Sequence, residues 1–293
     1  MSSPEARIDV AIGHATDDDA QTGCTVLLFS APALCAIDVR GGAPGTRETD
    51  LLQPGNLVQR ADAILLTGGS AFGLAAADGV MTWLREQERG FPTSAGPVPI
   101  VPAAVIFDLG AVNPAAPTRE MGYVACVEAI PIDSAHFGAI GAGRGASVAK
   151  ITGEAMPGGV GRGTATFDGG SVNAIAVVNA LGIVPNDLAD AARIDPRMNL
   201  LRNQPTAEFR ENTTLVALLV DAPASKDALI QCAISAHDGM ARAIFPCHTP
   251  YDGDLVFSVA LRPDLPSSPP SLPLTIASEL ATEAAIRNAI WER

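Results

Sequence analysis

The sequence predicts an α+β fold in which two β-sheets pack face to face with helices outside them. Strand-like and helix-like segments are mixed along the chain without strict β-α-β alternation, which favours a layered arrangement. Several apolar runs, above all 213–221, are apolar at both odd and even positions and should be buried on both faces. The chain has 293 residues, of which 47% are hydrophobic and 17% charged, so it can bury a large core.

Seven short apolar runs bounded by turn residues are predicted as strands. They are 24–30, 34–40, 61–69, 98–109, 171–180, 213–222 and 254–261. Helical periodicity indicates helices over 70–90, which Gly90 ends, over 225–244 with Ser225 as N-cap, and over 274–291 with Pro273 near the start. The glycine-rich stretch 138–170 is the least regular part, and its length fits a functional loop or a surface excursion equally well. Nothing in the composition forces a boundary, so residues 1–293 are expected to form a single domain.

The net charge of the chain limits the kinds of partner that it can bind. The net charge is −13 and the pI about 4.6, whereas nucleic acids and anionic membranes require a basic patch, so no nucleic acid, no membrane and a small-molecule substrate are expected. We see neither a leader-like segment nor an apolar run of about 18 residues, which favours a cytoplasmic protein.

The cysteines and histidines do not indicate a redox or metal site. The five cysteines lack C-x-x-C spacing and are expected to be reduced thiols, and the four histidines lack the H-E-x-x-H pattern. Cys247 beside His248 could suggest a thiol nucleophile, but adjacent strand residues point to opposite faces, so a structural pair is predicted. We expect no metal and no cofactor.

Two glycine motifs raise the possibility of a nucleotide site. Residues 141–146 match G-x-G-x-x-G/A, but they follow a poor strand and do not open a helix. The stretch "TGGSAFGL" (67–74) lacks both the P-loop lysine and the second glycine of a nucleophile elbow. It does place a helix N-terminus after a strand, so Gly68, Gly69 and Ser70 are predicted to bind a substrate oxygen; a tight turn of small residues is the alternative.

The stretch "FRENTTLVALLVDAP" (209–223) places Asn212 and Thr213 directly before a buried strand. A threonine hydroxyl is a weak nucleophile unless a base lies beside it, and a chain that begins with threonine supplies its own α-amine as that base. Within a chain this requires the Asn212–Thr213 bond to break itself. Asn-Thr alone is also an ordinary turn sequence.

Several segments in matching order strengthen the hypothesis. They are "RGGAPGTRETDLL" (40–52), "ADAILLTGGSAFGLAAADGVMTWL" (61–84), "PIVPAAVIFDL" (99–109), "GAGRGASVAK" (141–150), "NAIAVVNALG" (173–182), "NTTLVALLVDA" (212–222) and "HTPYDGDLVFSVA" (248–260). Together they resemble the self-processing L-aminopeptidase/D-esterase (DmpA-like) family, which includes β-peptidyl aminopeptidases, a nylon-oligomer hydrolase and a pantetheine hydrolase. The Asn-Thr junction and "DGD" are most similar to the last two. Only about 262–293 lies outside the resemblance.

The resemblance implies a four-layer αββα sandwich, cleaved into chains 1–212 and 213–293 and assembled as a tetramer of cleaved heterodimers. It implies Thr213 as the nucleophile and Asn179 as an oxyanion donor, although an asparagine closing a strand is also a common cap. Lys150, one of very few lysines, matches a lysine of the nylon-hydrolase site. Asp252 and Asp254 match an acidic pair; a plain Asp-Gly turn is the alternative.

The function we predict is an autoprocessed N-terminal-nucleophile aminopeptidase or amidohydrolase, acting on short peptides or amides through a Thr213 acyl-enzyme. Two alternatives stay open: an acyltransferase of the ornithine acetyltransferase type on the same fold, and a non-catalytic glycine-loop binding protein. The sequence leaves α-peptides, β-peptides, aminohexanoate oligomers and pantetheine-like amides all open as substrates.

Overall fold

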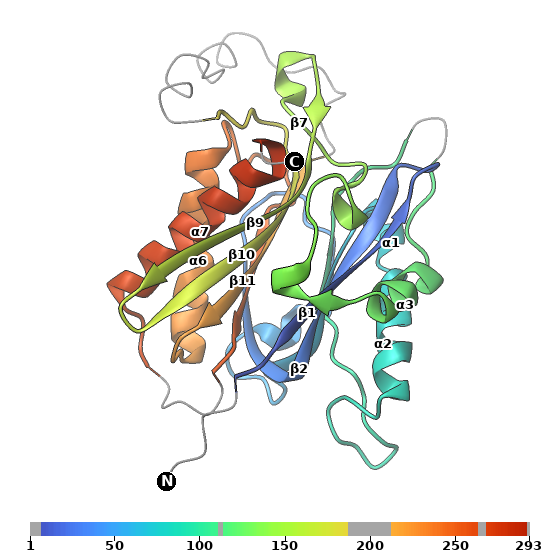
Figure 1. The fold of residues 1–293 in the computed structure, drawn as a ribbon, viewed down its shortest axis with the longest axis vertical. Helices are drawn as coiled ribbons and strands as arrows, with labels where there is room; N and C mark the ends of the chain where they lie inside the picture. Colours follow the sequence, from blue (N-terminus) through green and yellow to red (C-terminus); the bar gives the residue numbers. More distant parts are fainter. Residues whose placement is uncertain (1–6, 111–113, 187–211, 263–267, 292–293) are drawn as a thin grey trace.

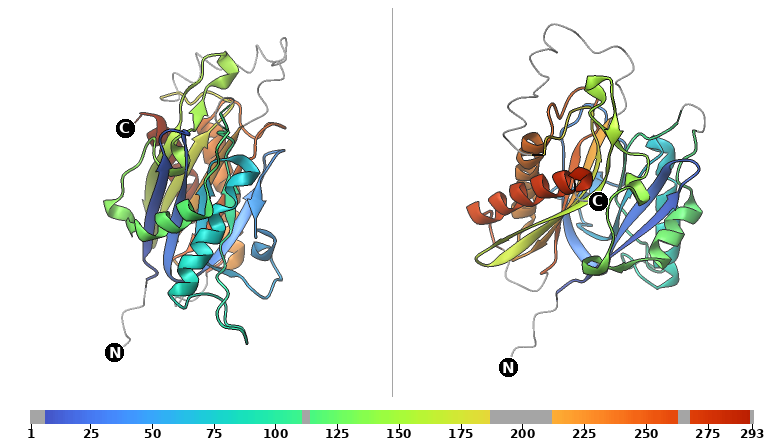
Figure 2. Two further views of the ribbon diagram at one scale, coloured as in Figure 1. Left: turned by 90° about the vertical axis from the view of Figure 1, so that its right-hand side faces the viewer. Right: turned by 45° about the horizontal axis from the view of Figure 1, so that its top comes forward.

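The computed structural model describes residues 7–110, 114–186, 212–262 and 268–291. Four layers lie across the view of Figure 1: helices α6 (Lys226–Ala243) and α7 (Leu272–Trp291), a sheet with β9 to β11, a sheet with β1 and β2, and helices α2 (Ala76–Glu86) and α3 (Arg119–Val127). The right-hand view of Figure 2 shows the same order of layers. This is the predicted αββα arrangement.

The main strands are β1 (Val10–Asp17), β2 (Thr22–Val39), β4 (Arg60–Thr67), β5 (Ala103–Val105), β9 (Gly159–Phe167), β10 (Gly170–Asn179), β11 (Thr213–Asp221) and β12 (Leu255–Ala260). Two-residue strands are β3 (Thr46–Arg47), β6 (Ile130–Pro131), β7 (Ser147–Val148) and β8 (Met156–Pro157), and α1 (Ser70–Gly73) is a single turn. Short 3-10 turns are η1 (Asp50–Leu52), η2 (Ile132–Ser134), η3 (Gly141–Gly143) and η4 (Lys150–Thr152).

Three apolar layers separate the four structural layers. Along β11, Val216, Leu218 and Val220 face α6 and α7, whereas the odd-numbered residues from Leu215 to Leu219 face the other sheet. β2 and β4 alternate in the same way between the central core and the core under α2 and α3. The two strand layers are parts of one ten-stranded sheet, because β2 pairs with β4 in one layer and with β12 in the other. Each strand layer is covered on both faces, which explains the continuous apolar runs in the sequence.

The strand register brings distant segments to one end of β11. β11 is antiparallel to β10, pairing Thr213 with Asn179, and parallel to β12, pairing Leu215 with Leu255. The first residue of β11 consequently lies beside the last residue of β10 and the segment that leads into β12.

Some predicted elements differ from the structure. The runs 24–30 and 34–40 form one long strand, β2, whose register with β4 shifts between Leu28 and Ala33, as at a β-bulge. Only 103–105 of the predicted 98–109 run is a strand, and β1 and α3 were not predicted. Residues 141–143 form a 3-10 turn, in keeping with the prediction that they do not open a dinucleotide-binding helix.

The glycine-rich stretch contains a strand, β9, and its glycines have a packing reason. A Cβ added at Gly159, Gly161 or Gly163 would lie 2.1–2.8 Å from backbone carbonyl oxygens of α7, those of Ala289, Ala285 and Ala281. These alanines recur every four residues, so the small side chains of α7 pack directly on the backbone of the strand.

Among the described residues, no helix combines the length and apolarity needed to cross a membrane.

Candidate active site

Thr213 opens β11 and is buried, with 5% of its surface exposed. Its Oγ donates a hydrogen bond to the carbonyl oxygen of Asn212 at 2.5 Å, so the hydroxyl lies against the peptide group that precedes it. The same oxygen accepts the backbone N–H of Gly253 at 2.9 Å. A donor on this oxygen stabilises the negative charge that would develop there if the carbonyl carbon were attacked.

Gly253 has no room for a side chain. A Cβ at this position would lie 2.6 Å from Thr213 Oγ and 2.9 Å from the carbonyl oxygen of Ala43. Glycine therefore lets the segment before β12 approach the hydroxyl closely enough for its N–H to reach the Asn212 carbonyl. The sequence analysis did not assign a role to this residue; its position between two aspartates in "DGD" was the available signal.

Lys150 and Asn179 meet beside Asn212. Lys150 Nζ donates to Asn179 Oδ1 at 2.8 Å and to Asn212 Oδ1 at 3.0 Å. Asn179 Oδ1 also accepts the N–H of Ser147, at 3.0 Å, while its Nδ2 donates to the Phe107 carbonyl at 3.0 Å. In this intact chain the Asn179 amide thus holds Lys150 in place, and its assignment as an oxyanion donor stays a prediction.

The two aspartates of "DGD" have different partners. Asp254 Oδ1 accepts the N–H of Thr214 at 2.7 Å, and its Oδ2 accepts both the backbone N–H and the ring Nδ1 of His248, each at 2.9 Å. Asp252 Oδ2 accepts the N–H of Thr249 at 2.7 Å. Burial and the charge of Asp254 raise the pKa of Asp252 to about 6. The pair therefore places one firmly hydrogen-bonded carboxylate and one proton-accepting carboxylate at the start of β11.

His248 takes part in this site, which the sequence analysis missed. The prediction of opposite faces for Cys247 and His248 assumed a strand, but His248 has a left-handed φ of 54° and lies in a turn. Non-glycine residues rarely adopt this conformation, and such strain concentrates at functional positions. The turn directs both the ring and the backbone N–H to Asp254.

The N–H groups of Gly68, Gly69 and Ser70 already have acceptors. They donate to the Gly23 carbonyl, to Asp108 Oδ1 and to the Ile106 carbonyl, at 2.8, 2.6 and 2.9 Å respectively. Substrate binding by these three residues stays a prediction, since a substrate oxygen would have to replace one of these acceptors.

Asp108 is a further residue that the sequence analysis did not select. Its Oδ2 accepts the Thr22 hydroxyl at 2.8 Å, and burial raises its pKa. It lines a cavity of about 220 Å³ together with Phe107, Leu109, Gly145, Ser147, Lys150 and Asn212. The cavity next to the Asn212–Thr213 bond thus has one carboxylate and one ammonium on its wall.

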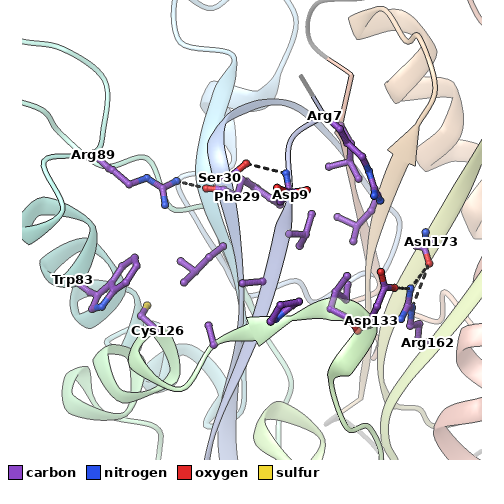
Figure 3. Close-up of a pocket in the computed structure, with 18 of the residues that line it drawn as sticks. Arg7, Asp9, Phe29, Ser30, Trp83, Arg89, Cys126, Asp133, Arg162 and Asn173 are labelled. Carbon is purple, nitrogen blue, oxygen red and sulfur yellow. Dashed lines mark hydrogen bonds and ion pairs between the residues drawn. The ribbon is translucent and has the colours of Figure 1, made fainter. Parts of the chain in front are cut away.

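A larger cavity of about 480 Å³ lies elsewhere, lined by residues of β1, β2, α2 and α3 and by residues of β9 to β11 (Figure 3). Its arginines have partners: Arg162 donates to Asp133 and Asn173, and Arg89 to the Phe29 carbonyl. Its wall on β11 is Leu219, about 20 Å along the strand from Thr213 at 3.3 Å per residue. The candidate chemistry is at the smaller cavity.

The fold is a layered α+β arrangement in which a buried threonine, Thr213, opens a central strand. The chain belongs to Peptidase family S58, whose sequence profile matches residues 8–292. It is therefore a hydrolase of peptide or amide bonds, and the resemblance found in the sequence is confirmed. The match includes 262–292, which the sequence analysis had left outside; α7, in that segment, covers β9 and β10.

Curated relatives and a solved structure are similar to this chain in sequence or in fold. An uncharacterised aminopeptidase of Mycobacterium tuberculosis is 45% identical over 279 residues, covering 86% of this chain and 79% of its own. A 6-aminohexanoate-oligomer endohydrolase of Agromyces is 32% identical over 281 residues, covering 89% and 76%. The L-aminopeptidase D-Ala-esterase/amidase from Ochrobactrum anthropi, described as a variant of the Ntn-hydrolase fold, superposes with a TM-score of 0.72 at 17% identity, covering 99% of this chain and 86% of that one.

Proposed function

We propose that this protein is a self-processing aminopeptidase or amidohydrolase that cleaves its own Asn212–Thr213 bond and then uses Thr213 as an N-terminal nucleophile. The observation that carries the proposal is the pair of hydrogen bonds on the Asn212 carbonyl, from Thr213 Oγ at 2.5 Å and from Gly253 N–H at 2.9 Å. One group is the attacking atom and the other is a donor for the charge that the attack creates.

Self-cleavage proceeds in two steps. Thr213 Oγ adds to the Asn212 carbonyl carbon, the C–N bond breaks, and the hydroxyl proton passes to the departing nitrogen, which leaves an ester between the two residues. The α-amine of Thr213 is free from this step on. Water then hydrolyses the ester, which releases the Asn212 carboxylate and frees the Thr213 hydroxyl. The two chains, 1–212 and 213–293, stay together because β10, β11 and β12 belong to one sheet.

The same groups serve the catalytic cycle. The α-amine of Thr213, with an ordinary pKa near 8, takes the hydroxyl proton as the substrate carbonyl is attacked. Gly253 N–H, with Asn179 as the predicted second donor, stabilises the oxyanion. Lys150 holds the acyl side of the substrate in the position that Asn212 occupies in the intact chain, and water hydrolyses the Thr213 ester.

The geometry around Asn212 in the intact chain supports a proposal for the class of substrate. Asn212 occupies the position of an acyl donor, so a substrate acyl group should enter the cavity of about 220 Å³ beside it. Asp108 on the wall of that cavity can pair with a substrate ammonium. This supports short amides with a free amino end, in keeping with relatives named as an aminopeptidase and an aminohexanoate-oligomer hydrolase.

A panel of aminoacyl p-nitroanilides, each with its N-acetylated counterpart, tests the proposal. We expect hydrolysis of the free-amino members, no hydrolysis by Thr213→Ala, and retained hydrolysis by the neighbouring control Thr214→Ala, because Asp254 binds only the backbone N–H of Thr214. Full activity of Thr213→Ala would refute the proposed nucleophile. Adding hydroxylamine or an amino acid acceptor separates the acyltransferase alternative, which would give transfer product in preference to hydrolysis.

A further inference from the structure

Two histidines form a hydrogen-bonded chain behind the acidic pair. His237 lies in α6 and is 1% exposed; its Nδ1 is 3.2 Å from His248 Nε2, and the two rings meet edge to face with centroids 4.7 Å apart. The other ring nitrogen of His237 is 3.2 Å from the Asp38 carbonyl oxygen, at the end of β2. His248 in turn bonds Asp254, so the hydrogen-bonded chain extends from the Asp38 carbonyl in β2 to the polar groups beside Thr213.

The hydrogen-bond partners at the two ends of this chain determine which ring nitrogens of His237 and His248 carry protons. The Asp38 carbonyl can only accept, so His237 Nε2 carries a hydrogen and its Nδ1 is an acceptor. His248 Nε2 must then donate to that Nδ1, while His248 Nδ1 faces a carboxylate oxygen that also accepts. His248 is consequently the imidazolium and His237 the neutral ring.

The environment favours the same charge distribution. Burial, together with the charge on His248, lowers the pKa of His237 to about 4, although the Asp38 carbonyl and the Asp38 carboxylate, 3.4 Å from Nε2, oppose this shift. Burial also opposes the charge on His248, but interactions with Asp254 and with Cys247 outweigh it and raise the pKa of His248 to about 10.

We propose that His237 and His248 are positioning residues that set the charge at the Thr213 nucleophile: His237 holds His248 as a cation, and this cation balances the Asp254 carboxylate. The inference rests on the proposed function, since it concerns the α-amine that self-cleavage creates on Thr213.

The reason is electrostatic. Two uncompensated carboxylates beside the Thr213 α-amine would keep it protonated, and an ammonium cannot accept the hydroxyl proton. A cation on Asp254 offsets one of these charges and favours the neutral amine. The charged and titratable groups that face the histidines or the amine are Asp38, Arg40, Lys150, Cys247, Asp252 and Asp254. Of the other cations, Arg40 pairs with Asp38 at 2.7 Å, and Lys150 bonds Asn179 and Asn212. His248 is a cation that bonds Asp254 directly, at 2.9 Å.

The pH dependence of kcat/KM tests this on enzyme whose small chain has been shown to begin at Thr213. The variants are His248→Gln, which removes the cation; His237→Leu, which removes both hydrogen bonds of the ring; and His237→Gln, whose amide can accept from His248 and donate to Asp38. The control is His136→Gln at an exposed histidine. Loss of a cation raises the pKa of any nearby group that must lose a proton, so the acid limb should move to higher pH by about one unit in the first two variants. His237→Gln and His136→Gln should keep the wild-type profile.

A cleaved His248→Gln enzyme with the wild-type acid limb would overturn the inference while leaving the proposed function standing. If His237→Leu does not fold, the pH profile of His248→Gln alone decides whether the inference holds. A His248→Gln chain that stays uncut at every pH from 6 to 10 would indicate a purely structural role and would also overturn it. Wild-type enzyme that is not cleaved at Thr213 would instead refute the proposed function.

Discussion

Replacing Lys150 with methionine should slow self-cleavage without stopping it. The ammonium donates to Asn179 Oδ1 and to Asn212 Oδ1. Without the ammonium, Asn179 still accepts the Ser147 N–H and donates to the Phe107 carbonyl. Asn212 loses the hydrogen bond by which Lys150 orients its side chain. A hydrogen bond to a charged group contributes about 1.5–3 kcal/mol. Taking about 2 kcal/mol for the one that orients the scissile residue, the cleavage rate should fall about 30-fold, since about 1.4 kcal/mol corresponds to a factor of ten.

The assay follows the disappearance of the intact chain after purification in the cold, by densitometry or intact mass. The matched control is Lys226→Met, which removes the chain's other lysine; Lys226 Nζ donates to the Cys35 carbonyl, away from Thr213. A Lys150→Met half-time within about two-fold of wild type, or an equal slowing in Lys226→Met, would refute the role given to Lys150.

Three further changes have defined outcomes. Asn179→Ala should still fold, with a lower melting temperature because three hydrogen bonds of this buried side chain are lost, and should lose about 10²- to 10³-fold in kcat, as for loss of an oxyanion donor; wild-type kcat would remove Asn179 from the site. Gly161→Ala puts a Cβ 2.1 Å from the Ala285 carbonyl oxygen and should cost about 1–3 kcal/mol in urea unfolding; an unchanged midpoint would contradict the close packing of α7 on β9. The pKa of Asp252 is raised on folding, from 3.8 to about 6, so the folded state binds more protons than the unfolded state and stability falls as pH rises through that window. Asp252→Asn should therefore raise the melting temperature at pH 7.5 and flatten its pH dependence, even as maturation is impaired; a lower melting temperature would contradict this.

The layered fold could be predicted because the core strands carry their own signal. Within 213–221, residues 215–220 are apolar at every position, and the structure buries the two faces of this run in two different cores. β9 gave no such signal, because Gly159, Gly161 and Gly163 pack through backbone against α7 rather than through side chains. A strand that a helix backbone covers this closely requires glycine, and glycine is typical of loops.

The residues predicted from the sequence do gather at one place. Lys150, Asn179 and Asn212 are joined by hydrogen bonds, and Thr213 lies beside them. The groups that sequence analysis missed act across long separations or through a turn. Asp108 reaches Thr22 across 86 residues, and His248 reaches Asp254 only because its φ is left-handed. No local spacing or periodicity encodes such contacts, so they became evident only when the segments were placed together.

The mass and N-terminal sequence of the purified protein test the central claim most directly. Scaling the 30.0 kDa chain by 212/293 gives a large fragment of about 22 kDa and a small one of about 8 kDa, which should migrate together under native conditions. The small fragment should begin Thr-Thr-Leu-Val, and Thr213→Ala should remain a single 30 kDa chain. An active enzyme that stays intact after prolonged incubation, or a small fragment that begins at any residue other than Thr213, would contradict the account.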